Sequence, residues 1–330
     1  MLDCFGEAAD YKGYMKRLFL LLAFAAAHAA QAQVWPAKPL RWIVPYPPGG
    51  STDIATRPLA ERVGQALGGH SGLVENRAGA GGNIGYEAAA KSAPDGYTVL
   101  VAVDALASNP HLYKISWDPF RDFVPVIQLA RQPVVLAVHP SLGVSSVAEF
   151  VAAAKRKPGL GFATSGAGSQ QHMAAAWFAK LAGIQLTHVP YKGGGQAITD
   201  LVGGQILVGS LGSSPLIPYY KAGRLKLLAQ STATRAASLP EVPTYEEAGY
   251  QGLVIEQWIA VFMPAGTPAD IVARLNAEIG KALADPGIRE RYAQAALEPV
   301  GGTPADLARL LRGDYDKYAR LIRELDIKLE

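Results

Sequence analysis

Short apolar runs alternate with helical stretches along most of the chain. After Leu40 the strand-like runs RWIVPY, GLVEN and YTVLVAV are separated by helical stretches at 53–67 and 84–92. A second series holds PVVLAVH, GLGFAT, LTHVPY, QILVGSL and LKLLAQS, with helical stretches at 146–156, 170–182 and 196–202 between them. Such alternation predicts parallel sheets covered by helices, arranged as two α/β lobes.

The C-terminal part of the chain predicts one more strand and a helical tail. VIEQWIAVFMPAG is the last strand-like run, and two helical stretches follow it. Each opens on TPAD, with Thr267 or Thr303 in the capping position. No low-complexity linker divides the chain, so we expect the lobes to be joined by crossing strands.

The N-terminal residues have the pattern of a secretory signal. Met15-Lys16-Arg17 precedes the apolar run LFLLLAFAAA, and Ala30-Gln31-Ala32 follows it. We therefore expect residues 1–32 to be a signal peptide with an upstream extension, translation to start at Met15, and cleavage to follow Ala32. No later run reaches the roughly 20 apolar residues that a membrane helix needs.

Composition narrows the class of protein. The 330 residues are 49% hydrophobic and 18% charged, which is typical of a globular chain. The formal net charge is +3, and residues 1–32 remove three cations and three acids without changing it. This small charge argues against nucleic acid as a partner. Cys4 is the only cysteine and the histidines are scattered, so we expect no metal.

Three loops have the strand, glycine-rich turn and helix arrangement that holds anions. They are PYPPGGST at 45–52, TSGAGS at 164–169 and KGGG at 192–195. The first N–H groups of a helix lack internal acceptors, and the helix dipole favours negative charge there. The first two loops add hydroxyls to bare backbone, whereas the glycines of the third also fit a plain flexible turn.

None of these loops matches an enzyme motif letter by letter. A phosphate-binding P-loop ends in Gly-Lys followed by Ser or Thr, which no loop supplies. The hydrolase elbow has glycine two residues before its serine, but Ala163 precedes Ser165. In RAGAGGNIG, Gly79 and Gly81 are followed by Ile84 where a dinucleotide fingerprint has its third glycine.

The residues alone thus favour an exported two-lobed receptor over an enzyme. A hydrolase that uses Ser165 or Ser169, or a nicotinamide-dependent enzyme that uses Gly79–Gly85, is the alternative class, and a scaffold without a ligand is a third. His172 lies in the first turn of its helix, where local packing and ligand contact are both open. For Tyr46 the alternative is ordinary packing.

Many motifs resemble one family of receptors. VPYPPGGSTDIATR, VENRAGAGGNIG, WDPFRDFVPV, TSGAGSQQHMAAAWFAKLAG and VPYKGGGQAITDLVGGQI are similar to the periplasmic solute receptors of tripartite tricarboxylate transporters, the Bug family. The resemblance runs from Trp35 to Glu330. It implies a type II periplasmic-binding-protein fold, an α/β architecture whose two lobes are joined by two crossing strands and close over a ligand.

The resemblance also implies lobe boundaries and a binding site. Lobe 1 would comprise 33–135 and 256–330, and lobe 2 would comprise 136–255, with crossings near 133–138 and 255–262. A small organic carboxylate would lie between the lobes, with no catalytic residue and no cofactor. The ligand-binding residues carried over are Tyr46, Gly49, Gly50, Ser51, Thr52, Ser165, Gly168, Ser169, His172 and Ser210.

One departure from the family bears on the ligand. Relatives often carry acids after the third loop, where this chain has Ile206-Leu207 and Gly209-Ser210-Leu211-Gly212. A desolvated ammonium group needs a carboxylate or several acceptors. We therefore expect a ligand without a cation, an aliphatic or aromatic mono- or dicarboxylate. The expected partners are membrane permease subunits or, in an orphan role, a sensor kinase, and the receptor is expected to be a monomer in the periplasm.

Overall fold

The computed structural model describes residues 15, 35–69 and 72–329. Apart from Met15, the expected signal peptide lies outside the described residues, as do Cys4 and the cleavage point after Ala32. Lys38–Glu330 form one compact unit, which holds all the elements named below. Among the described residues, no helix is long and apolar enough to cross a membrane.

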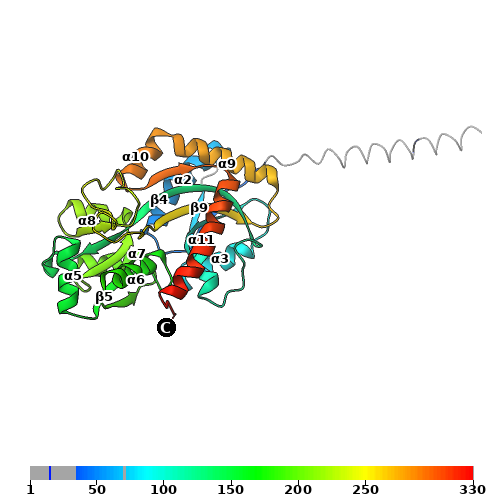
Figure 1. Cartoon of the computed structure of the whole chain (residues 1–330). Helices are drawn as coiled ribbons and strands as arrows, with labels where there is room; N and C mark the ends of the chain where they lie inside the picture. Colours follow the sequence, from blue (N-terminus) through cyan, green and yellow to red (C-terminus); the bar gives the residue numbers. More distant parts are fainter. Residues whose placement is uncertain (1–14, 16–34, 70–71, 330) are drawn as a thin grey trace, which may run out of the picture. The chain divides into compact units, whose positions relative to one another are not determined.

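The strands of this unit form a single sheet in the order β2-β1-β3-β9-β4-β7-β5-β6, with β8 and β10 paired to β4. Figure 1 shows helices around the strands. The strands are β1 (Arg41–Val44), β2 (Leu73–Asn76), β3 (Thr98–Val103), β4 (Phe123–Val138), β5 (Leu160–Thr164), β6 (Leu186–Pro190), β7 (Val208–Gly212), β8 (Lys226–Gln230), β9 (Glu256–Pro264) and β10 (Glu298–Gly301).

The sheet is mixed, so the prediction of parallel sheets holds for only part of it. β1 pairs in parallel with β2 and β3, and β5 pairs in parallel with β6 and β7. β4 and β9 run antiparallel to each other and to their other neighbours. After the segment 231–255, β9 enters between β3 and β4 and runs in the opposite direction to both.

Two passages of the chain join the halves of the sheet at adjacent points. β4 pairs with β9 up to Pro133↔Glu256, and with β7 from Val134↔Gly212 onward. On the return, the Ile255 N–H donates to the Ser231 carbonyl oxygen, and β9 begins one residue later. Both points fall inside the ranges expected for the crossings, 133–138 and 255–262. The full lobe boundaries, 33–135 with 256–330 and 136–255, stay a prediction.

Helices cover the sheet on both halves. α2, α9 and α10 pack together, and α11 packs on β4 and α4. The helices are α2 (Ser51–Ala66), α3 (Asn83–Ala90), α4 (Ala105–Ser108), α5 (Val147–Arg156), α6 (Gln170–Ala182), α7 (Gly194–Val202), α8 (Ile217–Lys221), α9 (Ala269–Ala284), α10 (Pro286–Gln294) and α11 (Pro304–Glu324). Short 3₁₀ turns lie at Ala80–Gly82, Asn109–His111, Pro140–Leu142 and Ser214–Leu216.

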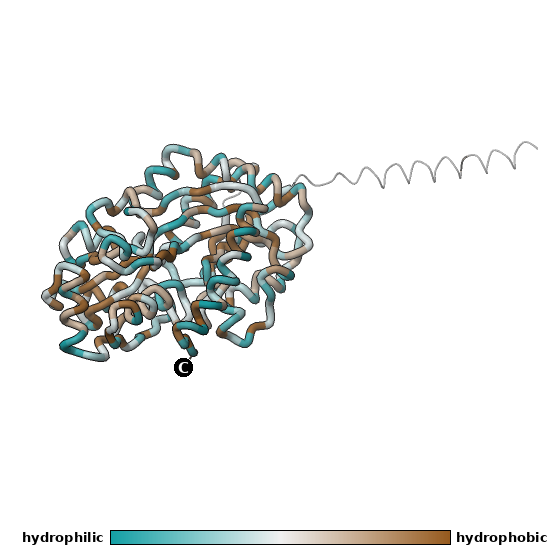
Figure 2. Tube along the Cα trace, viewed as in Figure 1, coloured by the Kyte–Doolittle hydropathy of each residue, from teal (hydrophilic) through white to brown (hydrophobic). Residues whose placement is uncertain are grey.

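Apolar side chains from strands and helices form the core. In the half that contains β5, the fully buried Phe150 of α5 and Phe178 of α6 stack at 6.1 Å between ring centroids, and Tyr245 lies 5.1 Å from Phe178. In Figure 2 the hydrophobic stretches are dense around this half of the sheet. Burying such rings contributes a few kcal/mol each, so this half has a hydrophobic core of its own.

The helical tail differs from the expectation in two places. Thr303 caps α11 through a capping box with Asp306, as predicted. Thr267 does not cap α9, because its hydroxyl donates to the Pro264 carbonyl oxygen in the turn after β9, and Pro268 takes the capping position. The short strand β10 also interrupts the tail and pairs with β4.

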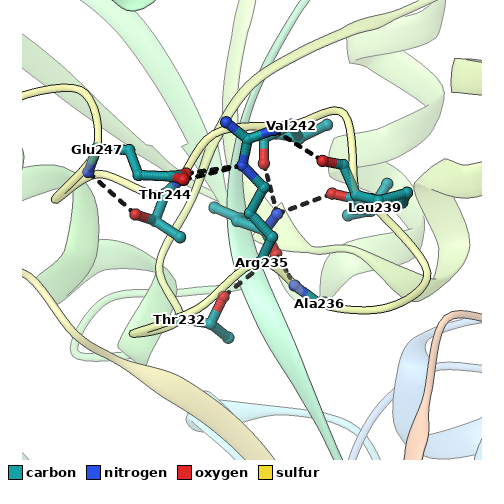
Figure 3. Close-up of polar contacts among 9 residues, drawn as sticks. Thr232, Arg235, Ala236, Leu239, Val242, Thr244 and Glu247 are labelled. Carbon is teal, nitrogen blue, oxygen red and sulfur yellow. Dashed lines mark hydrogen bonds and ion pairs between the residues drawn. The ribbon is translucent and has the colours of Figure 1, made fainter.

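A loop without regular structure leads from β8 toward the second crossing (Figure 3). The buried Gln230 side chain donates to the carbonyl oxygens of Leu239 and Val242 and accepts from the Ala236 N–H. Arg235 forms an ion pair with Glu247 at 2.8 Å. Side chains thus satisfy the buried backbone groups of this loop and fix the point from which β9 enters.

Candidate functional site

A cleft lies where loops from both halves of the sheet meet, and we call it the central cleft. It encloses about 520 Å³ of empty space, its open mouth included. Residues one or two positions after the ends of β1, β3 and β5 line it, namely Tyr46, Asp104 and Ser165. In open α/β sheets, the ends of the strands at a change of topology are the usual place for a ligand.

The structure brings six of the ten expected ligand-binding residues together in the central cleft. These are Tyr46, Gly50, Ser51, Thr52, Ser165 and Ser169. The other four, Gly49, Gly168, His172 and Ser210, are not among the described residues that line it. Each of these four has a structural contact that accounts for its position.

Asp53 fixes the first loop. Its carboxylate accepts from the Gly49 N–H at 3.1 Å, from Arg57 and from the Asn76 amide at 2.9 Å. The same amide nitrogen of Asn76 also donates to the Tyr46 carbonyl oxygen. Burial raises the pKa of Asp53, but these hydrogen bonds outweigh it and hold the pKa below its usual value. Gly49 therefore serves the shape of the loop.

The N-terminus of α2 is open toward a ligand. Gly50 is the capping residue, and no side chain caps the helix. The first intrahelical bond runs from the Ile54 N–H to the Gly50 carbonyl oxygen. The N–H groups of Ser51, Thr52 and Asp53 precede it and have no acceptor within the helix. Neither Ser51 nor Thr52 caps α2.

The second loop uses its own side chains for support. The Ser169 hydroxyl accepts from the His172 N–H at 3.2 Å and donates to the Gly166 carbonyl oxygen at 2.8 Å. The side-chain amide oxygen of Gln171 accepts from the Ser165 N–H, and the backbone carbonyl oxygen of Gln171 accepts from the buried Ser210 hydroxyl at 2.7 Å. Ser169 is thus a helix cap at the wall of the cleft, and Ser210 supports that wall from behind.

Gly168 permits close approach of the two halves. Its φ is +73°, and a Cβ there would lie 2.0 Å from Cδ1 of Leu112. The Gly168 carbonyl oxygen accepts from the Ser108 hydroxyl at 3.1 Å. Ser108 and Leu112 follow β3, whereas Gly168 follows β5, so the loops from both halves touch beside the cleft.

His172 makes local packing contacts and also lines a neighbouring pocket with His188 and Lys192, so its contact with a ligand stays a prediction. Its ring stacks on His188, with centroids 3.7 Å apart and 12° between the planes. Its Nδ1 accepts from the Gly168 N–H, and Nε2 of His188 lies 2.7 Å from the Thr164 hydroxyl. Burial lowers the pKa of His172 to about 4, and burial together with His172 lowers that of His188 to about 3. Both rings are neutral at pH 7.

The third loop places another helix N-terminus at the cleft. Gly193 precedes α7 with φ +131°, and no side chain caps this helix. A Cβ on Gly193 would lie 2.6 Å from Cδ of Pro47, so the glycine allows the turn to rest on the proline-rich first loop. Gly194 lines the cleft. The N-termini of α2, α6 and α7 therefore converge there.

Asp104 is the only acid among the described site residues that sequence reasoning missed. Among the described residues that line the cleft, none is Lys, Arg or His, and Asp104 is the one acid. Burial and the nearby Asp314 raise its pKa well above the usual range. It directly follows the strand-like run YTVLVAV, as the first two loops follow theirs, and this position was the available signal. Gln171 and Gln257 also line the cleft and were not expected.

A buried polar chain ties the two halves together behind the cleft. The Gln170 amide of α6 donates to the Tyr318 hydroxyl of α11. Tyr318 donates to Oδ2 of Asp314 at 3.2 Å, and the same oxygen accepts from the Trp258 indole at 2.7 Å. With these contacts and those of Gly168 and Gly193, the structure has its halves in contact around the cleft.

Comparison with solved structures identifies the class of protein. The chain is similar to periplasmic binding protein BugD (28% identity, 90% of this chain and 100% of that chain, TM-score 0.85). It is also similar to an R. palustris protein solved with adipate (33% identity, 89% and 99%, TM-score 0.86). The fold is that of a periplasmic binding protein, with two α/β lobes and a cleft between them.

Sequence comparison identifies the family. Residues 55–327 match the model of the family described as tripartite tricarboxylate transporter family receptor. The chain is 36% identical over 317 residues to protein BugT of Bordetella pertussis, covering 95% of this chain and 97% of that protein. The chain therefore belongs to the tripartite tricarboxylate transporter receptor family. This family consists of receptors rather than enzymes.

Proposed function

We propose that this protein is a periplasmic receptor that binds a small organic carboxylate in the central cleft. The observation that carries the proposal is the convergence of the N-termini of α2, α6 and α7 on a cleft that no described Lys, Arg or His lines. Each helix N-terminus provides N–H donors and roughly half a positive charge. Together they favour a ligand with one or two negative charges, bound without a cationic side chain.

The proposed ligand contacts follow from the N–H donors that have no acceptor within their helices. Backbone N–H groups of Ser51, Thr52 and Gly194 hold the carboxylate, and the side chains of Tyr46 and Ser165 border it. The R. palustris relative solved with adipate supports a small organic carboxylate as the ligand. Asn76 and Asp53 act indirectly, by keeping the first loop in its shape.

Transport is the proposed role of binding. The exported protein delivers its ligand to the permease subunits of a tripartite tricarboxylate transporter, and residues 1–32 direct it to the periplasm. N-terminal sequencing of the protein from a periplasmic extract is expected to start at Gln33. A mature form that begins at Met15 or upstream of it would contradict the export step and leave ligand binding intact.

A thermal-shift screen tests ligand binding. The purified chain is unfolded and refolded to strip carried ligand, and is then mixed with mono-, di- and tricarboxylates, aromatic acids and acidic amino acids. A ligand that binds only the folded state raises the thermal midpoint by mass action. At a free ligand concentration of 100 times Kd, the folded state is stabilised by about 2.7 kcal/mol. We expect one class of carboxylate without an ammonium group to raise it. A flat response to every acid would refute the proposal.

A further inference from the structure

The carboxyl group of Asp104 is a buried acid whose function the fold does not explain. Its exposed fraction is 2%, it lines the central cleft, and its Oδ1 has no hydrogen-bond partner among the described residues. A buried polar atom without a partner costs free energy, so such an atom at a binding cleft calls for a ligand contact.

Among the described residues around Asp104, no cation is available to pair with it. The titratable groups that face it are Tyr46, Tyr86, Asp314, Lys317 and Tyr318. The only cation in this set, Lys317, is bound to Asp314 at 2.7 Å. An ionised Asp104 would thus be a second buried negative charge beside Asp314, which is strongly unfavourable.

Neutral Asp104 resolves both difficulties. Burial, followed by Asp314, raises the pKa of the Asp104 carboxyl group well above its usual range, and the backbone N–H groups of Asp104 and Gln170 offset this only in part. A protonated carboxyl group carries one O–H donor, which an ionised carboxylate lacks. A donor of this kind adds to the N–H groups of the helix N-termini and does not repel an anion.

We propose that Asp104 is a specificity-determining residue of the central cleft, a neutral carboxylic acid whose O–H donates a hydrogen bond to a carboxylate oxygen of the ligand. This inference rests on the proposed function and specifies the ligand further. The ligand presents an acceptor toward Asp104. An amino-acid ligand with its ammonium group at this position is disfavoured, because pairing with it would require ionised Asp104.

Two substitutions at Asp104 separate the neutral donor from a charge. Asp104→Asn keeps the shape, is uncharged and places an N–H donor where the acid has its O–H. Asp104→Ala removes the donor. Asp316→Asn, an exposed position on α11, is the matched control for the loss of a carboxylate. The probe is adipate at pH 7, or the carboxylate with the largest midpoint shift if adipate is inactive, and Kd is measured by calorimetry.

The expected result is a graded one. Asp104→Asn and the control bind within about threefold of the wild type, whereas Asp104→Ala binds roughly tenfold or more weakly, the loss typical of a hydrogen bond to a charged group. Equal weakening by Asn and Ala would show that a charged carboxylate is needed and overturn the inference. Unchanged binding by Asp104→Ala would overturn it as well. If the wild type binds none of the carboxylates, the proposed function and the inference both fall.

A second measurement does not depend on the folding of the alanine variant. The ¹³C signal of the Asp104 carboxyl group, assigned by its absence in Asp104→Asn, is expected at the protonated position at pH 7 in the ligand-free protein. An ionised signal at pH 7 would overturn the inference while leaving carboxylate binding by the cleft unaffected.

Discussion

The stacked pair His172 and His188 makes the stability of the protein depend on pH. Both rings are neutral in the folded state, with pKa values of about 4 and about 3 against an ordinary value of 6.5. On acidification below 6.5 the unfolded state takes up protons that the folded state does not. The stability that the histidine pair contributes is therefore fully present above about pH 7 and is lost as the pH falls toward 4.

The magnitude follows from these pKa values. Between pH 7 and pH 5, protonation of one histidine in the unfolded state favours unfolding by about 2 kcal/mol. A histidine with a folded-state pKa of about 4 takes up almost no protons over the same range, so the folded state gains almost no compensating free energy. The buried His172 is assigned this full amount. His188 is half-buried and partly screened by solvent, so we assign it about 1 kcal/mol. Together they account for a loss of about 3 kcal/mol.

Urea unfolding at pH 7 and pH 5 measures this loss. The double variant His172→Gln/His188→Gln should lose about 3 kcal/mol less than the wild type between the two pH values, and His139→Gln in the turn after β4 is the control. Asp104 contributes with the opposite sign in this range, but it is present in all three proteins and cancels in the difference. An unchanged pH dependence in the double variant would refute the reasoning.

Further predictions follow from the loops around the cleft. Gly193→Ala places a Cβ 2.6 Å from Pro47 at φ +131°, which costs about 1–3 kcal/mol when the two halves are in contact. It should therefore weaken adipate binding in calorimetry about fivefold to a hundredfold. The control Gly143→Ala, at φ +73° with no neighbour within 4 Å, should leave Kd unchanged. Asp53→Asn loses charge-assisted hydrogen bonds and should lower the free energy of unfolding by about 1–3 kcal/mol at pH 7. This difference should shrink as the pH falls below the ordinary aspartate pKa of 3.8. Equal urea midpoints for the variant and the wild type at pH 7 would contradict the prediction. The raised pKa of Asp104 costs stability as the pH rises above 3.8, so the wild type recovers part of this stability on acidification from pH 7 to pH 5. Asp104→Asn lacks this recovery and should lose more stability than the wild type over that range. A smaller loss in the variant would contradict the prediction.

Local patterns predicted the first loop well. A strand, a proline-glycine turn and a hydroxyl-bearing helix start are contiguous in the sequence, and Tyr46, Gly50, Ser51 and Thr52 all line the cleft. Local chemistry did not predict how the hydroxyls are used, because the capping of α2 by Gly50 depends on the backbone path set by Asp53 and Asn76.

Tertiary relations account for what the sequence did not reveal. Asp104 is a single acid after an apolar run, and only the folding of β3 beside β9 and α11 shows that it is buried at the cleft. β10 is a four-residue strand with proline and glycine, and its pairing with β4 gives it that structure. Pairings of this kind join residues far apart in the sequence, so no local window contains them.

Backbone amide NMR tests the central claim most directly. The carboxylate that gives the largest midpoint shift is titrated into the ¹⁵N-labelled protein, and the amide signals at the three helix N-termini are followed. We predict the largest shifts at Ser51, Thr52, Gln171 and Gly194, saturating together with one Kd. A neighbouring pocket is lined by His188 and Lys192, and shifts confined to those residues, with the four amides unmoved, would contradict binding in the central cleft.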